Sequence, residues 1–164
     1  MPPGFQAISG VQEAELVPLP PWEISPPETA AQRRGLAYER KAHAHFERKF
    51  SERYLASPWF HYTRTNTRGL SRSNFCQPDG LLFDIPQGRI IILEMKLRHT
   101  PDAWWQLFYR YIPVVKAAYP GFELEVCEVT PFLDPAVRCP EPPVLCSNPW
   151  NPTPGAFNVH CFRG

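Results

Sequence analysis

The sequence lacks the patterns typical of disulfide-rich, zinc-binding and membrane-spanning proteins. Its five cysteines are odd in number and include no Cys-x-x-Cys pair, so neither a disulfide framework nor a zinc site is predicted. No apolar run approaches the length of a membrane span, and the N-terminal stretch lacks the basic start and apolar core of a signal peptide. We therefore expect a cytoplasmic protein without a membrane partner.

An excess of one charge is also missing, because 17 Lys and Arg residues balance 16 Asp and Glu residues and leave a net charge of +1. The charges are unevenly distributed, however. Residues 1–32 carry four acids and no Lys or Arg, whereas residues 33–72 carry ten basic residues and three acids. A basic block suits a phosphodiester substrate, although a solvated helix rich in arginine has the same composition.

The 164 residues are enough for one domain with a substantial core, since 43% of them are hydrophobic. Residues 1–24 are acidic and rich in proline, which predicts an extended arm that packs on its own domain or on a partner. Residues 131–164 contain eight prolines and no clear periodicity, which predicts an irregular tail packed on the domain or on a partner. The folded domain is expected over residues 25–130.

The most informative stretch is a predicted β-hairpin. Two apolar, β-branched runs flank residues 85–88, which have Pro in the second and Gly in the fourth position of a tight turn. Pairing across this turn sets Asp84 opposite Arg89 and apolar residues opposite one another behind them. The same register places Asp79 directly across from Glu94.

Opposed carboxylates repel each other unless a positive charge lies between them, and carboxylate oxygens are the ligands that Mg²⁺ prefers. Lys96 projects from the same face of the strand as Glu94, because it lies two residues further along. The residues before Glu94 are apolar on both faces. A buried strand that becomes charged only at its end indicates the floor of a site, whereas the alternative is an edge strand with a solvated Glu and Lys.

A helix is predicted from a capping box at Ser25 and Glu28 to about Arg53. Its apolar stripe includes Glu39, where an unpaired carboxylate would be costly. Glu39 is therefore either part of a functional site or one half of a buried salt bridge. His43, one turn further, is expected to pack beside the site rather than to act in it.

Other elements follow from local patterns. Residues 59–64 are expected to form the first strand, and residues 65–74 a flexible polar loop whose Arg68 and Arg72 either contact DNA or are merely solvated. A second helix starts at Thr100 and Pro101 and should kink or break at Pro113. Residues 122–130 alternate in polarity and predict the last strand.

Three segments resemble motifs of one known family. Pro78-Asp79, a gap of fourteen residues and Glu94-Met95-Lys96 resemble the signature of PD-(D/E)XK nucleases, the restriction-endonuclease-like superfamily. The segment that ends at Glu39 is similar to the first motif of the RecB-like branch, and Gln106-Leu-Phe-Tyr109 is similar to its Gln-x-x-Tyr motif. The order of the predicted elements resembles the αβββαβ core of that superfamily.

The resemblance implies an α/β fold with a mixed central sheet flanked by helices, and it implies a site. Asp79, Glu94, the Met95 carbonyl and Glu39 would hold Mg²⁺, for which Mn²⁺ would substitute, and Lys96 would orient the attacking water or stabilise the transition state. The predicted DNA-binding residues are Gln106, Tyr109, Arg110, Arg68 and Arg72. Some RecB-like enzymes hold an iron–sulfur cluster, but the late cysteines here are too widely spaced for one to be expected.

The predicted function is a metal-dependent DNA nuclease that leaves 5′-phosphate ends, acting in DNA repair, recombination or phage DNA processing. A phage-encoded protein of this kind would act in the host cytoplasm or the virion. The proline-rich arms suggest a protein partner or a homo-oligomer. The alternative is a nuclease fold that serves as a DNA-binding or structural subunit of a larger assembly, such as a phage particle.

Overall fold

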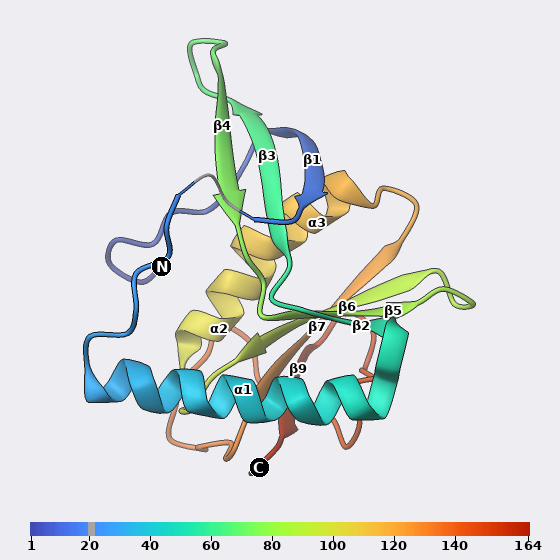
Figure 1. Cartoon of the computed structure of the whole chain (residues 1–164). Coiled ribbons are helices and arrows are strands. Elements are labelled where there is room, and N and C mark those ends of the chain that lie inside the picture. Colours follow the sequence, from blue (N-terminus) through green and yellow to red (C-terminus); the bar gives the residue numbers. More distant parts are fainter. Residues whose placement is uncertain (20–21) are drawn as a thin grey trace.

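The chain folds into a mixed β-sheet with helices on both faces and a smaller sheet that projects from one end (Figure 1). The structure is a computed structural model that describes residues 1–19 and 22–164. The predicted α/β class with a mixed sheet is confirmed. In order across the main sheet, the strands are β2 (Tyr54–Ala56), β5 (Gly80–Asp84), β6 (Arg89–Met95), β7 (Glu123–Thr130), β9 (Phe157–Cys161) and β8 (Val144–Leu145).

The β5–β6 hairpin has the predicted register. Asp84 pairs with Arg89, and the apolar pairs follow behind them as expected. The Gly88 amide donates to the Ile85 carbonyl at 3.0 Å, and Gly88 has a φ of 62°, which glycine adopts without strain. Strand β2 is antiparallel to β5, whereas β6, β7, β9 and β8 all run parallel. The hairpin therefore lies where the sheet changes from antiparallel to parallel.

Helix α1 (Ala30–Phe50) covers one face of this sheet and is followed by a short 3₁₀ turn, η1 (Ser51–Arg53). Its capping box is formed by Thr29 and Gln32, so the predicted start at Ser25 was wrong. Apolar residues on α1 recur every four positions and pack on the β5 and β6 side chains. The buried residues of the helix are Tyr38, Ala42, Phe46 and Phe50.

The opposite face is covered by α2 (Pro101–Gln106), the π-helical segment η2 (Leu107–Tyr111) and α3 (Ile112–Ala118). These segments follow one another directly, so of the predicted kink or break at Pro113 the break is absent. Proline has no N–H to donate, and the π-helical turn before it shifts the hydrogen bonds so that the chain continues. None of the described helices is long and apolar enough to cross a membrane.

The second sheet corrects three predictions. It consists of β1 (Val11–Val17), β3 (Trp59–Thr65) and β4 (Ser71–Cys76), in the order β1-β3-β4. Strand β1 lies within the predicted irregular arm, of which residues 20 and 21 lie outside the described part. Strand β4 includes residues 71–74 of the predicted loop, and β3 belongs to this sheet rather than to the main one. Here cross-strand pairing outweighs the weak local patterns of β1 and β4.

The C-terminal segment also differs from its prediction. Strand β9 pairs in parallel with β7, and both Phe157 and Val159 on it are fully buried. Residues 131–164 therefore supply a core strand, and the main sheet does not end at Thr130. The prolines of this segment lie in the long connection between the two strands, where they do not interrupt pairing.

Candidate active site

The predicted carboxylates meet beside the open end of the β5–β6 hairpin. Asp79 lies directly before β5, and Glu94 is the penultimate residue of β6. The Met95 amide donates to Asp79 Oδ2 at 2.6 Å, which fixes the Asp79 carboxylate against β6. The contact seen at Met95 is thus through its N–H, and the predicted role of its carbonyl stays a prediction.

Glu94 is a buried charge with one partner. It is 3% exposed, and its Oε1 lies 2.9 Å from Lys96 Nζ. Its Oε2 is buried and has no hydrogen-bond partner among the described residues. Because a buried carboxylate normally satisfies both oxygens, the second oxygen of Glu94 is available for a further positive group.

The ionisation of these groups is coupled. Burial raises the pKa of Asp79 well above its usual range, and the nearby charges of Glu94 and then Glu39 raise it further. Burial opposes the charged form of Lys96, but the ion pair with Glu94 outweighs this and raises the pKa of Lys96 overall. The site therefore has more carboxyl groups than its one lysine can neutralise, and Asp79 takes up a proton more readily than a solvated aspartate does.

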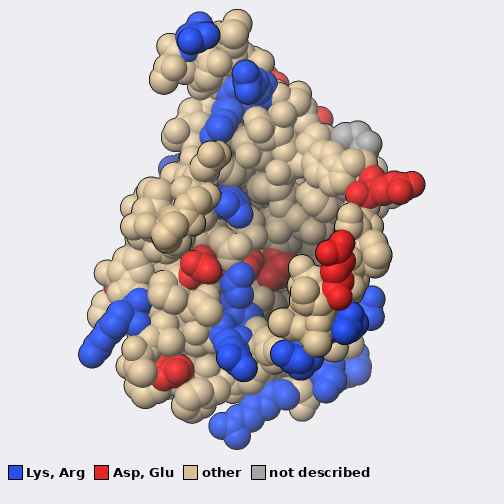
Figure 2. All heavy atoms as spheres, turned by 90° about the vertical axis from the view of Figure 1, so that its left-hand side faces the viewer, with Lys and Arg blue, Asp and Glu red and all other residues tan. Residues whose placement is uncertain are grey.

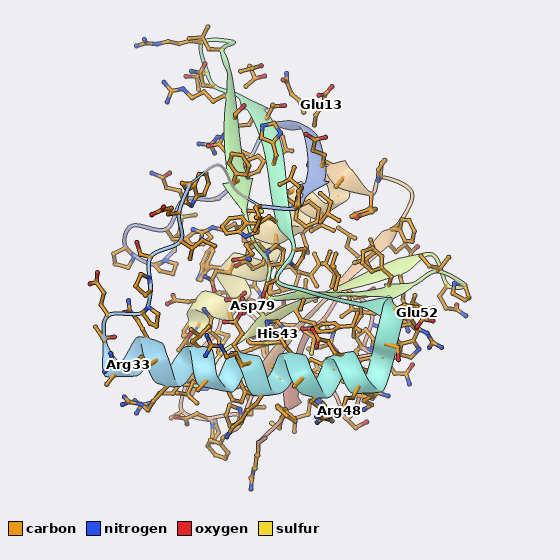
Figure 3. The ribbon with its side chains drawn as sticks, in the orientation of Figure 1. Glu13, Arg33, His43, Arg48, Glu52 and Asp79 are labelled. Atoms are coloured by element: carbon orange, nitrogen blue, oxygen red, sulfur yellow. The ribbon has the colours of Figure 1, made fainter. Side chains whose placement is uncertain are left out.

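Glu39 reaches the same neighbourhood from α1. Its Oε1 lies 3.2 Å from His43 Nε2, and the Ser57 hydroxyl is 3.0 Å from the same nitrogen. His43 Nδ1 contacts the hydroxyl of Tyr54, whose ring lies against Gly80 where a Cβ would come within 2.7 Å of it. In Figure 3, His43 and Asp79 are both drawn above the middle of α1.

Two residues of this region were missed by the sequence analysis. Glu128 pairs in register with Glu94 on the neighbouring strand, and its Oε2 lies 2.7 Å from Nδ1 of His99. Both side chains are fully buried, and burial raises the pKa of Glu128 to about 8. The position of Glu128 beside Glu94 was not predictable from the sequence, because the paired residues of β6 and β7 lie some thirty residues apart in the chain.

The predicted DNA-binding residues separate into two groups. Gln106 and Tyr109 lie on the helical run, where Gln106 Oε1 is buried without a partner among the described residues and Tyr109 packs against Trp104 and Trp105. Arg68 lies in the turn of the β3–β4 hairpin and Arg72 on β4. Arg110, on η2, lies 5.0 Å from the ring of Phe5.

The basic block is also divided in space. Six of its members lie exposed on α1: Arg33, Arg34, Arg40, Lys41, Arg48 and Lys49. The arginines of the β3–β4 hairpin form a separate group above the site. Figure 2 shows the face of the molecule that lies on the left in Figure 1. Acidic atoms lie in a hollow of that face, with Lys and Arg atoms above and below the hollow.

The donor atoms of this site fit a hard divalent cation. Glu94 Oε2 is a buried oxygen without a partner in the described part of the chain, and Asp79 lies beside Glu94. No three His, Cys, Asp or Glu side chains of residues 1–19 and 22–164 converge closely enough to form a complete ligand set. A cation bound at Glu94 Oε2 would therefore take its remaining ligands from outside these side chains.

Comparison with known proteins identifies no relative. No protein-family model, curated protein or solved structure matches the chain.

Asp79→Asn is expected to stabilise the metal-free protein. Folding raises the pKa of Asp79, so protonated Asp79 favours the folded state. Its contribution to the free energy of unfolding is complete below the unfolded pKa of about 3.9 and is lost as the pH rises through the folded pKa. Asparagine keeps an oxygen for the Met95 amide but has no charge to bury. Urea unfolding in EDTA should show a gain on the order of 1 kcal/mol at pH 8 and a smaller gain at pH 5.

The matched control is Asp102→Asn, at an exposed position in the first turn of α2. It should change the free energy of unfolding by less than about 0.5 kcal/mol at either pH. Equal stability of wild type and Asp79→Asn at pH 8 would show that the Asp79 carboxylate is not held at a cost to the fold.

Proposed function

We propose that this chain is a Mg²⁺-dependent deoxyribonuclease of the PD-(D/E)XK type. The observation that carries the proposal is the state of Glu94, which is buried with one oxygen on Lys96 and the other without a partner among the described residues. Asp79 lies beside it with a raised pKa. Two adjacent carboxylates and a lysine are the groups needed to hold a divalent cation and a water next to a phosphodiester.

The chain's own residues have distinct roles in this proposal. Asp79 and Glu94 hold Mg²⁺, or Mn²⁺ in its place, with help from the Met95 carbonyl and from Glu39. When bound, the cation lowers the pKa of a water molecule and neutralises charge that develops on the phosphate. Lys96 orients the attacking water or stabilises the transition state, since its ammonium lies 2.9 Å from Glu94 Oε1.

The order of elements supports the assignment to this superfamily. Along the chain, α1, β2, β5, β6, the α2–α3 helical run and β7 follow the order αβββαβ. The β3–β4 hairpin is inserted between the first and second strands of this series. Glu39 lies on the first helix of this series. Asp79 lies directly before its second strand, and Glu94 lies on its third strand. These are the places to which the family resemblance assigns the acids.

The proposed substrate is DNA, cut to leave 5′-phosphate ends during repair, recombination or phage DNA processing. The arginines of the hairpin and of η2 support this proposal, because phosphate groups are bound chiefly through guanidinium and ammonium groups. Gln106 and Tyr109 would position the DNA backbone or brace Lys96.

The test is DNA cleavage by the full chain with Mg²⁺, Mn²⁺ or EDTA. The substrates are linear duplex DNA and single-stranded DNA, both labelled at one end, and circular DNA. We expect cleavage with either metal and none with EDTA, followed by recovery when Mg²⁺ is added back. The ends should accept a ligase without prior phosphorylation. DNA binding without cleavage under every metal condition would contradict the nuclease proposal and favour a structural or DNA-binding subunit.

A further inference from the structure

Two arginines face each other across the β3–β4 hairpin. Arg64 on β3 and Arg72 on β4 are direct partners in the antiparallel register, which places their Cβ atoms about 5 Å apart. No carboxylate of the described residues lies within ion-pair distance of either guanidinium. Since like charges in this position are destabilising, the pair points to an anion that binds between them.

Arg64 of this pair lines the upper end of a groove, and Arg72 lies opposite it on β4. Below it on the same face, Tyr62 pairs with Asn74, and both line a groove of about 410 Å³ together with Arg64 and Arg110. The described residues that line this groove include no Asp or Glu. The groove therefore offers positive charge and amide groups to a polyanion, with no carboxylate to repel it.

One wall of the groove is aromatic. The ring centroid of Trp22 lies 4.9 Å from that of Phe75 and 5.9 Å from that of Trp59. The ring planes meet at 88° in both pairs. Trp22 is 50% exposed, so part of its ring is free to receive a flat partner. Base stacking on aromatic side chains is the usual way in which proteins bind unpaired nucleotides, and it requires base faces that a duplex does not expose.

The lower end of the groove leads to the candidate active site. Gln77 lines the groove, lies two residues before Asp79 and donates through its side-chain amide to the Ser57 carbonyl at 2.9 Å. Tyr111 also lines the groove. Burial raises the pKa of its hydroxyl, and Glu94 and Asp79 are near enough for their charges to raise that pKa further. A strand lying in the groove would thus pass from the arginine pair to the carboxylates.

We propose that the groove between the β3–β4 hairpin and η2 binds a single-stranded segment of DNA, so that the substrate is a single strand or a duplex with an unpaired end. The arginines 64, 72 and 110 contact its phosphates, and the Trp22 cluster stacks on its bases. This inference names the substrate class of the proposed nuclease and rests on that function for its link to Asp79. The binding step itself can be measured without cleavage.

The test is fluorescence anisotropy of the full chain in EDTA with a labelled oligothymidine of about twelve nucleotides and with a blunt duplex of the same length. We expect the single strand to bind at least about ten-fold more tightly than the duplex. The double variant Arg64→Ala/Arg72→Ala should weaken single-strand binding about ten-fold and make the slope of log affinity against log salt less negative by about 1.4. Trp22→Ala should weaken binding about ten-fold with little change in this slope.

The matched control is Arg33→Ala/Arg34→Ala on the exposed face of α1, which removes the same charge away from the groove. It should change the affinity less than about two-fold. Equal affinity for duplex and single strand, or equal losses in the groove and control variants, would overturn the inference. Single-strand preference without cleavage in Mg²⁺ would support the groove and contradict the proposed nuclease, whereas cleavage without that preference would do the reverse.

Discussion

Glu94→Gln is expected to reduce metal-dependent DNA cleavage at least about 10³-fold while the protein stays folded. Glutamine has the same shape as glutamate, so it fills the buried space at the end of β6 and still accepts a hydrogen bond from Lys96. It lacks the charge that a divalent cation requires. The measurement is the initial rate of cleavage of labelled DNA in Mg²⁺, with folding checked by circular dichroism.

Two further variants separate chemistry from stability. Glu123→Gln makes the same change at an exposed position on β7 and should retain wild-type cleavage. Lys96→Met should also abolish cleavage, but it leaves Glu94 as an uncompensated buried carboxylate and should cost about 3 kcal/mol of stability. The double variant Glu94→Gln/Lys96→Met should recover most of that stability without recovering cleavage. Normal cleavage by Glu94→Gln would overturn the assignment of this site.

Phe157→Ala is expected to destabilise the protein by about 3–5 kcal/mol, which is a large part of the stability of a typical domain. Phe157 is fully buried on β9, where it packs with the β6 and β7 side chains beneath the helical run. Removing its ring leaves a cavity in the larger of the two cores. Chemical denaturation should show a lower midpoint and an unchanged slope.

The control for this variant is Phe132→Ala, which removes the same ring at a position that is 59% exposed. It should cost less than about 1 kcal/mol. The same reasoning predicts that a chain ended at Thr130 fails to fold, because β7 would lose β9, one of the two strands with which it pairs. A stably folded chain of residues 1–130 would show that β9 is dispensable.

The sequence by itself determined the part of the candidate site that depends on short-range geometry. The turn at residues 85–88 fixes the register of the β5–β6 hairpin, and strand alternation then sets the sides on which Glu94 and Lys96 project. Helical periodicity likewise placed Glu39 on the apolar stripe of α1, where its side chain is 28% exposed, and Pro101 marked the start of α2. In each case a few neighbouring residues contain the whole signal.

Only the tertiary structure decided the features that join distant segments. The pairing of β7 with β9 crosses a proline-rich connection with no local pattern, and β1 lies in a segment whose composition predicted an arm. The register that sets Glu128 beside Glu94 depends on how strands from separate parts of the chain are aligned. Such pairings gain their stability from side chains buried between layers, and single-sequence periodicity carries no information about which strands those will be.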